Sequence, residues 1–324
     1  MTVVELRPFT VPMRQRFRRV TRRSGVLLRG DAGWGEFSPF PEYGPEVTAR
    51  WLSAAVAAAE DAFPTPRRDR VPVNTTVPAV DAVTAHDLVV GSGCATAKVK
   101  VAEPGQDLAE DLERVAAVRD ALGPAGHVRI DANGAWDVAT ATLAISRLDA
   151  AAGGLQYCEQ PCATLEELAE VRRRVDTPLA ADESIRTAAD PLRVALAGAA
   201  DVVVVKVQPL GGVERALEVV QAAGLPAVVS SAVETSVGLA AGVALAAALD
   251  ELPYACGLGT ATLLAADVTD DPLTPVAGAL PVRRVSPDPA MLAQCDPSPE
   301  ESEDLLERLH LAAAGGGDAA GGGR

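Results

Sequence analysis

From residue 71 onward, short runs of β-branched and apolar residues alternate with stretches rich in Ala, Leu and Glu. This alternation is typical of repeated βα units, which build a parallel sheet. The strand candidates are Val71–Val77, Ala97–Val101, Val128–Asn133, Leu155–Glu159, Leu179–Glu183, Val202–Gln208, Ala227–Ala232 and Tyr254–Leu258. Eight strands predict an α/β fold of the (β/α)8 TIM-like barrel type, because a doubly wound sheet more often contains about five or six.

The stretches between these strands carry helical patterns. The clearest are Asp107–Ala121, Thr164–Val175, Val213–Ala223 and Val237–Leu249. Strands and helices together predict a (β/α)8 barrel domain over residues 71–265.

Residues 1–70 follow a different pattern and predict an α+β capping domain. The runs Val3–Val11, Phe17–Arg29 and Trp34–Ser38 are typical of an antiparallel meander, and a helix is expected around Val47–Ala62. The sequence Gly-Asp-Ala-Gly between the second and third runs favours a tight turn.

The C-terminal part is expected to divide into two segments. Residues 266–312 are Pro-rich, end in a helical pattern at Ser302–Ala312, and are expected to return to the cap. The Ala/Gly-rich tail, residues 313–324, has too few apolar side chains to pack, so we expect it to be disordered.

The chain is acidic, with a formal net charge of −15 and a pI near 4.7. An acidic surface repels nucleic acid and anionic membranes, so neither is an expected partner and a small molecule is. The longest uncharged apolar run, Val237–Leu249, is shorter than the roughly 20 residues that span a bilayer. The sequence does not predict an oligomeric state.

The five cysteines fit a reducing compartment, which favours a cytoplasmic protein. Cys158 and Cys162 invite a zinc interpretation. Their C-x3-C spacing, the lack of a second cysteine pair and a total of three histidines favour small buried apolar side chains instead.

Only three of the 29 basic residues are lysines, namely Lys98, Lys100 and Lys206. The pKa of a lysine can fall far enough for the side chain to act as a base near neutral pH, whereas that of arginine cannot. The alternative is that a biased base composition depleted lysine and three remained by chance.

Polar residues interrupt the apolar strand candidates at their C-terminal ends, one βα unit apart. They are Lys98 and Lys100, Asp131 and Asn133, Glu159, Asp182 and Glu183, Lys206, and Ser230 and Ser231. Strand ends of this kind meet at one rim of a (β/α)8 barrel, where the active site lies. Residues two apart, such as Lys98 and Lys100, share one face of a strand.

Three carboxylates at one rim, Asp131, Glu159 and Asp182, would repel each other strongly. A hard dication with oxygen ligands relieves the repulsion, which favours Mg²⁺. The alternative is that each carboxylate caps a helix or pairs with an arginine. Lys100 and Lys206 are expected to face each other across the metal, an arrangement suited to removing a proton α to a carboxylate.

Five strings carry a resemblance to the barrel motifs of the muconate-lactonizing branch of the enolase superfamily. They are T-A-K-V-K-V, R-I-D-A-N-G-A-W, Y-C-E-Q-P-C, A-A-D-E-S and V-V-V-V-K-V-Q-P. Within that branch, A-V-V-S-S-A-V-E-T-S-V-G-L and the sequence Gly257-Leu258-Gly259-Thr260 are similar to the seventh and eighth strand segments of the o-succinylbenzoate synthase family. Dipeptide epimerases carry an Asp-x-Asp pair on the eighth strand, and this sequence has none.

The resemblance implies a lyase, a dehydratase that converts 2-succinyl-6-hydroxy-2,4-cyclohexadiene-1-carboxylate to o-succinylbenzoate in menaquinone biosynthesis. It implies Mg²⁺, for which Mn²⁺ may substitute, as a pattern known for this superfamily. Asp131, Glu159 and Asp182 are then the metal ligands, with Lys100 as acid and base and Lys206 as the opposing cation. The residues expected to bind substrate or support the site are Lys98, Asn133, Glu183, Ser230, Ser231, Gly257 and Arg14.

A cap loop around Met13, Arg14, Arg16 and Phe17 is expected to help bind the succinyl arm, although its arginines could equally form a solvated turn. Two other functions stay open. An N-acylamino acid racemase, acting on N-succinylamino acids, would use the same metal and the same two lysines. A non-catalytic barrel that serves as an interaction module is a more distant alternative.

Overall fold

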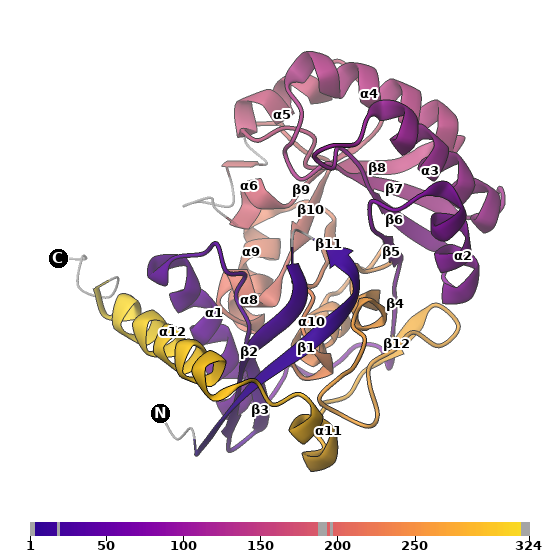
Figure 1. Cartoon of the computed structure of the whole chain (residues 1–324). Coiled ribbons are helices and arrows are strands. Elements are labelled where there is room, and N and C mark those ends of the chain that lie inside the picture. The colour runs from indigo at the N-terminus through magenta and orange to yellow at the C-terminus, as the bar shows by residue number, and fades with distance from the viewer. Residues whose placement is uncertain (1–3, 18–19, 187–192, 195–196, 319–324) are drawn as a thin grey trace.

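A computed structural model describes residues 4–17, 20–186, 193–194 and 197–318. Figure 1 shows a curled parallel sheet wrapped by helices, with an antiparallel sheet and further helices against one side of it. The parallel strands, in chain order, are β5 (Thr75–Val77), β6 (Thr96–Lys100), β7 (His127–Asp131), β8 (Leu155–Glu159), β9 (Leu179–Ala181), β10 (Val202–Val205) and β11 (Ala227–Val229). They pair in sequence order, so the predicted barrel architecture is confirmed.

The predicted first and eighth strands differ from those observed. Val71–Val77 divides into β4 (Arg70–Pro72), whose strand partner lies outside the seven-stranded sheet, and β5, which belongs to that sheet. The expected strand Tyr254–Leu258 is reduced to two bridging residues, Cys256 and Gly257, because a 3-10 helix, η1 (Gly259–Leu263), begins directly after them.

These two residues nevertheless close the barrel. On one side the Cys256 amide donates to the Pro72 carbonyl at 2.7 Å, and the Cys256 carbonyl accepts from the Asn74 amide at 2.9 Å. On the other side the Gly257 amide donates to the Val229 carbonyl at 2.8 Å. The β5 and β11 edges of the seven-stranded sheet are therefore joined through the backbone.

Helices follow the parallel strands and have clear stop and start signals. They are α2 (Ala82–Ser92), α3 (Leu108–Leu122), α4 (Val138–Ala152), α5 (Leu165–Arg172), α6 (Glu183–Arg186), α8 (Val207–Leu210), α9 (Val213–Ala223) and α10 (Ser236–Ala248). Asp107 and Thr164 begin α3 and α5 with complete capping boxes, and Gly93 and Gly153 end α2 and α4 in the left-handed conformation. These local signals explain why the predicted helix boundaries agree with the observed ones within a few residues.

The N-terminal part is an antiparallel meander followed by a helix, as predicted. It consists of β1 (Glu5–Phe17), β2 (Val20–Gly30), β3 (Gly33–Phe37) and α1 (Pro45–Glu60). Gly30 pairs with Gly33 across the expected tight turn. Met13–Phe17 is part of β1 rather than a loop. Met13 bridges to Leu264, and Phe17 pairs with Val20 of β2 after a register irregularity that begins at Pro12. Val3, the expected first strand residue, lies outside the described residues.

The C-terminal segment returns to the N-terminal part, as Figure 1 shows. It contains β12 (Ala279–Pro281), which pairs with β4, then α11 (Pro289–Gln294) and α12 (Pro299–Asp318), which packs against α1. The helix extends past Ala312, so residues 313–318 are helical and not disordered as expected. Ala312 is buried and Gly315 lies close enough to Pro45 to pack on the start of α1. Residues 319–324 lie outside the described part of the chain.

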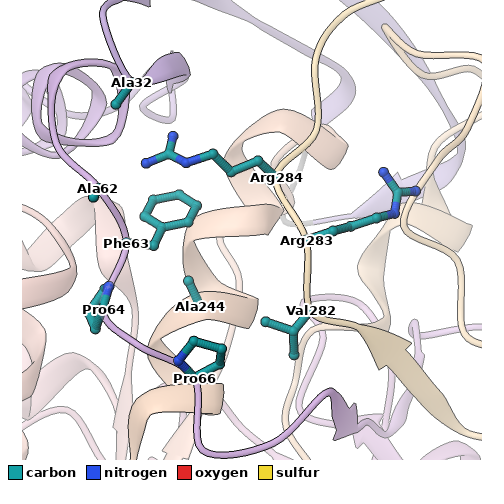
Figure 2. Close-up of a pocket in the computed structure, with 9 residues that line it drawn as sticks. All are labelled: Ala32, Ala62, Phe63, Pro64, Pro66, Ala244, Val282, Arg283 and Arg284. Carbon is teal, nitrogen blue, oxygen red and sulfur yellow. The ribbon is translucent and has the colours of Figure 1, made fainter.

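Arg284 connects the C-terminal segment to the end of α1. Its guanidinium donates to the carbonyl oxygens of Ala58, at 2.7 Å, and Asp61. It also lies over the ring of Phe63, 3.7 Å from the ring centre. Figure 2 shows Arg284 and Phe63 near Ala244 of α10, where they line a surface pocket of about 390 Å³. The last carbonyls of α1 are thus satisfied by a side chain more than 200 residues away.

Helix α10 is buried almost along its whole length. Thr235 precedes it and makes no capping hydrogen bond of its own. Instead, the Glu36 carboxylate of β3 accepts from the Gly238 amide at 3.1 Å, and the Asp267 carboxylate accepts from the Ser236 amide at 3.2 Å.

Within the described ranges no helix is long and apolar enough to cross a membrane.

We expect Gly35→Ala to destabilise the protein by about 1–3 kcal/mol, because its new methyl group would overlap the Ala55 carbonyl oxygen of α1. Chemical denaturation monitored by circular dichroism measures the effect. Gly91→Ala in α2 is the matched control, since nothing lies within 4 Å of an added methyl group there. The control is expected to be neutral or slightly stabilising. Equal stability of the two variants would contradict the close packing of β3 on α1.

Candidate active site

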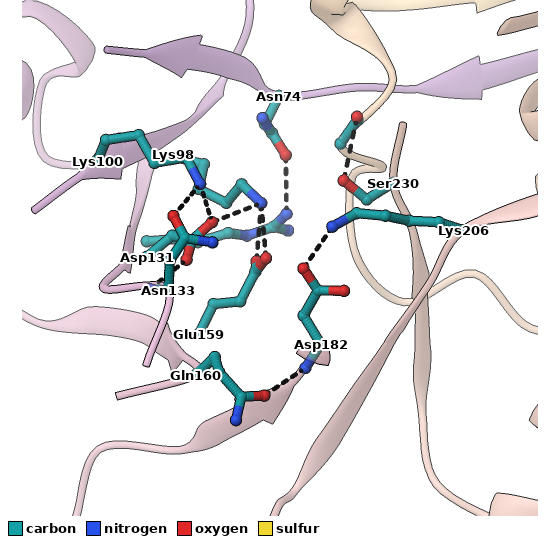
Figure 3. Close-up of polar contacts among 12 residues, drawn as sticks. Asn74, Lys98, Lys100, Asp131, Asn133, Glu159, Gln160, Asp182, Lys206 and Ser230 are labelled. Atoms are coloured by element: carbon teal, nitrogen blue, oxygen red, sulfur yellow. Dashed lines mark hydrogen bonds and ion pairs between the residues drawn. The ribbon is translucent and has the colours of Figure 1, made fainter. Parts of the chain in front are cut away.

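The polar residues predicted at the strand ends lie together in one cluster (Figure 3). The strand register aligns them, because Lys100 pairs with Asp131 between β6 and β7, and Asp131 pairs with Glu159 between β7 and β8. Parallel pairing therefore brings side chains from different βα units to one level of the barrel. Asp182 and Lys206 follow directly after β9 and β10 and face this group.

Lys98 holds the two carboxylates of the neighbouring strands. Its Nζ atom donates to both oxygens of Glu159, at 2.9 and 2.8 Å, and lies 3.4 Å from Asp131 Oδ2. Burial opposes its charge, but the carboxylates of Glu159 and Asp131 hold the pKa of Lys98 above its ordinary value. Lys98 is therefore a fixed cation in this arrangement.

Glu159 responds to the same surroundings in the opposite way. Despite its contact with Lys98, burial and the nearby Asp131 carboxylate raise the pKa of Glu159 to about 7. Burial also opposes the ionisation of Asp131, but Lys100 and Lys98 hold the pKa of Asp131 below its usual range. Burial thus outweighs the attraction of Lys98 at Glu159, whereas the lysines outweigh burial at Asp131.

Lys100 has a different environment from Lys98, although the two share one face of β6. It donates to Asp131 and, at 2.7 Å, to Asn133 Oδ1, and it lies 5.4 Å from the centre of the Phe17 ring. Burial holds the pKa of Lys100 below its ordinary value, and the Lys98 ammonium acts in the same direction against the attraction of Asp131. Lys100 is thus the lysine better suited to giving up its proton.

Lys206 lies on the opposite side of the cluster and donates to Asp182 (Figure 3). Gln160 fixes the backbone at Asp182, because its Oε1 atom accepts from the amides of Asp182, at 3.0 Å, and Ser184, at 3.2 Å. Gln160 itself has a φ of +39°, a conformation stabilised by these hydrogen bonds and by its donation to the Cys162 carbonyl. Sequence reasoning gave Gln160 no role.

Asn133 and Glu183 extend the cluster toward its exposed edge. Asn133 Nδ2 donates to Glu183 Oε1 at 3.2 Å, while the Asn133 amide donates to Asp131 Oδ1 at 3.0 Å. Asn133 therefore connects the contact made by Lys100 to the loop after β9.

Ser230, Ser231 and Gly257 form the other side of the rim. Ser230 Oγ lies 3.4 Å from the Gly257 carbonyl, and a methyl group added to Gly257 would press against Ser230. Ser231 Oγ shares a hydrogen bond of 2.6 Å with Thr260 Oγ1. The glycine is thus needed for the seventh and eighth segments to approach each other.

Residues from both sides of the rim line a narrow cavity of about 30 Å³. The cap contributes Phe17 and Phe40 to its lining, and the barrel contributes Thr76, Thr260, Asp131 and the three lysines. Because its volume is that of about one water molecule, the cavity as described does not hold a substrate.

A larger depression of about 1020 Å³ adjoins the cavity through Phe17, Lys100 and Asn133. Arg16 lines this depression. Arg14, the cap residue predicted to bind substrate, is exposed on β1 and is separate from the cluster. The alternation of side chains along β1 separates the two arginines from the buried Met13 and Phe17.

Arg129 lies inside the barrel below the cluster and was not predicted. It is fully buried and donates to Gln156 Oε1 at 2.7 Å, Asn74 Oδ1 at 3.2 Å and the Ala255 carbonyl at 2.7 Å. Its guanidinium also lies over the Tyr157 ring, 4.7 Å from the centre. Its position two residues before Asp131 on the same strand face is the signal that could have identified it.

The three predicted metal-binding carboxylates lie at adjacent strand ends and are buried, as a site for a hard dication requires. Among the residues that the structure describes, no group of three acidic, His or Cys side chains has the geometry of a bound metal. The lysines contact these carboxylates instead. Three carboxylates fit a hard dication, whose positive charge would offset the burial that raises the pKa of Glu159 to about 7.

Structural comparison supports the fold. The chain superimposes on N-succinyl Arg/Lys racemase from Bacillus cereus ATCC 14579 with a TM-score of 0.77 at 18% identity, covering 91% of this chain and 97% of the other. It also matches a dipeptide epimerase from Enterococcus faecalis V583, solved in complex with Mg and the dipeptide L-Leu-L-Tyr, with a TM-score of 0.70 at 22% identity, covering 88% and 98%. Members of the superfamily that shares this fold use Mg²⁺.

Sequence comparison identifies the family. Residues 81–287 match the family model described as enolase C-terminal domain-like, and residues 9–59 match the one described as enolase N-terminal domain-like. The chain is 66% identical to the o-succinylbenzoate synthase of Thermobifida fusca (strain YX) over 293 residues, which cover 90% of this chain and 92% of the relative. The chain therefore belongs to the enolase superfamily and, within it, to the o-succinylbenzoate synthase family.

Proposed function

We propose that this chain is a lyase that dehydrates 2-succinyl-6-hydroxy-2,4-cyclohexadiene-1-carboxylate to o-succinylbenzoate, a step of menaquinone biosynthesis. The observation that carries the proposal is the 66% identity, over nine tenths of the chain, to a protein named for this activity. The opposed lysines and the buried carboxylates supply chemical groups suited to the reaction.

Asp131, Glu159 and Asp182 are the proposed ligands of Mg²⁺. A dication bound there would polarise the substrate carboxylate and stabilise the negative charge that develops when the α-proton leaves. Lys100 and Lys206 have to withdraw from Asp131 and Asp182 for this to happen, because they now contact those carboxylates. Binding of the dication would thereby free both lysines for the substrate.

Lys100 is the proposed acid and base. Its uncharged amine takes the α-proton, and the electron pair of the C–H bond forms the new ring double bond as the C–O bond breaks. The same ammonium then protonates the departing hydroxyl, so water leaves and the ring becomes aromatic. The lowered pKa of Lys100 supports this role, since a base must lose its own proton first.

The other site residues would hold the substrate and the machinery in place. Lys206 is the proposed opposing cation. Lys98 would orient the Glu159 carboxylate, and Asn133 would orient Lys100. Ser230, Ser231 and Gly257 are proposed to contact the substrate from the seventh and eighth segments. The remaining proposed binding residues are Glu183 and Arg14, of which Arg14 has the weaker support because it is exposed away from the cavity.

The two ends of the chain are proposed to form one functional unit. Residues 1–70 and 266–312 would act as a cap over residues 71–265, which is supported by the packing of α12 on α1 and by Phe17 and Phe40 in the cavity lining. The five buried, unpaired cysteines support the expectation of a cytoplasmic location.

N-succinylamino acid racemisation is the second candidate function. The pair of opposed lysines favours it, because racemisation takes a proton from one face and returns one to the other. The structural similarity to an N-succinyl Arg/Lys racemase concerns the fold only.

Removal of divalent cations with excess EDTA is expected to abolish dehydration, and added Mg²⁺ should restore it. Glu159→Gln should raise the Mg²⁺ concentration for half-maximal activity by roughly tenfold or more. Glu166→Gln, an exposed acid in the first turn of α5, is the matched control and should leave the requirement unchanged. Full turnover in excess chelator would show that the carboxylates do not bind an essential metal.

Lys100→Arg is expected to lower kcat by at least about 100-fold, since general acid–base catalysis contributes roughly 10²–10⁴ and a guanidinium cannot serve as the base. Circular dichroism should show an unchanged fold. Arg215→Lys, on the exposed surface of α9, controls for a substitution between lysine and arginine as such and should keep full activity. Turnover of Lys100→Arg within about tenfold of the parent, a barrier change of only about 1.4 kcal/mol, would exclude Lys100 as the base.

Incubation with N-succinyl amino acids in D2O distinguishes the two candidate functions. A dedicated synthase should dehydrate the cyclohexadiene acid much faster than it exchanges an α-proton, and Lys100→Ala should damage dehydration more than Lys206→Ala. A racemase should exchange the α-protons of both enantiomers, and Lys206→Ala should remove exchange from one enantiomer only. Mass spectrometry of each enantiomer measures the exchange. Rapid exchange of both with slow dehydration would favour the racemase.

A further inference from the structure

The loop after β11 contains a β-branched residue in a backbone conformation that such residues avoid. Val233 has a φ of +62°, in the left-handed region, where its branched side chain is strained. It is buried and lines the same cavity as Ser230, Ser231 and Lys206. A strained residue of this kind persists only where its neighbours hold it in place.

The cap supplies one of the groups that hold it. Arg23 of β2 is 2% exposed, and its Nε atom donates to the Val233 carbonyl at 3.0 Å. The rest of the guanidinium is held by the cap itself, because Nη2 donates to the carbonyl and, at 3.4 Å, to the hydroxyl of Ser38, and the group lies 4.2 Å from the centre of the Phe40 ring. Arg23 therefore offers Nε to the loop in a fixed direction.

The amide side of Val233 is held from the barrel. The Val233 amide donates to Ser231 Oγ at 3.0 Å, and Ser231 Oγ also shares a hydrogen bond with Thr260. Both peptide groups of the strained residue are thus restrained, one by the cap and one by a predicted substrate-binding serine. A rotation of the Val233 backbone would also move the Ser231 hydroxyl.

A second cap residue holds the far end of the loop. Glu36 of β3 accepts from the Thr235 hydroxyl at 2.5 Å and from the Thr235 amide at 3.3 Å. Ser38, which Arg23 contacts, donates to the same carboxylate at 2.6 Å. The loop is therefore attached to the cap at two points that belong to one buried network.

We propose that Arg23 is a positioning residue for the active site: by holding the Val233 carbonyl, it keeps residues 230–233 in the conformation that presents Ser230 and Ser231 to the substrate. Arg23 lies behind this loop and acts on the substrate only through it. The inference rests on the proposed function for the identity of the substrate, but the restraint of the loop is independent of that identity.

Val233→Gly separates positioning from general packing, because glycine adopts positive φ without strain and makes the loop less dependent on Arg23. We expect Arg23→Met to raise the KM for the cyclohexadiene acid by about tenfold or more in the parent, with kcat changed less than about threefold. In the Val233→Gly background, Arg23→Met should raise KM by less than about threefold. Equal effects of Arg23→Met in both backgrounds would overturn the proposal.

Hydrogen exchange of the whole chain gives a readout that does not need activity. Arg23→Met should increase amide exchange in peptides covering 230–236 and leave those of α9 unchanged. Arg22→Met is the matched control, since Arg22 is the adjacent residue of β2 and is exposed in an ion pair with Glu301. It should change neither KM nor exchange in the loop.

Arg23→Gln, which keeps a donor on a shorter side chain, serves if Arg23→Met does not fold. It should give the same loop-specific increase in exchange. An unchanged loop, or an equal increase across the cap and barrel, would contradict the proposal. If no variant and not even the parent dehydrates the cyclohexadiene acid, while the loop-specific exchange appears, the proposed function fails and the positioning role stands.

Discussion

The balance of charge among six buried or nearly buried side chains governs this barrel mouth. Three carboxylates from the ends of β7, β8 and β9 lie against three lysines from β6 and the end of β10. A buried charge without a partner is strongly unfavourable, so each group depends on the others. The proposed substrate carries two carboxylates and the proposed metal two positive charges. Metal and substrate together therefore add no net charge to the site, whereas either of them alone would leave the site with an uncompensated charge.

Environment, rather than residue type, distinguishes the two lysines of β6. Lys98 is held by two oxygens of Glu159, whereas Lys100 contacts Asn133 and the edge of the cavity beside Phe17. One strand thus carries a permanent cation and a candidate base two residues apart. The proposed mechanism uses this difference, because Lys98 stays charged and holds Glu159 while Lys100 transfers the proton.

Much of this arrangement could be predicted from the sequence, because strand period and βα spacing bring Lys100 and Asp131 to one rim. The closing of the barrel could not, since Cys256 and Gly257 are recognisable as an eighth strand only by their partners on both sides. Arg129 was missed for a related reason: its partners come from three other segments of the chain. Local sequence patterns predict helices and strands of ordinary length. A strand as short as Cys256–Gly257 can be recognised only from its hydrogen bonds to distant segments.

The capping of α10 has a consequence for how the chain reaches this state. The Glu36 carboxylate and the Thr235 amide that donates to it are 199 residues apart, and Asp267 lies 31 residues after the Ser236 amide that donates to it. A helix whose first amides are satisfied only by distant segments gains its full stability late, after large loops have closed. The seventh βα unit therefore depends on segments that precede and follow it, and a nascent chain that has not yet reached Asp267 would hold this helix with the Ser236 amide unsatisfied.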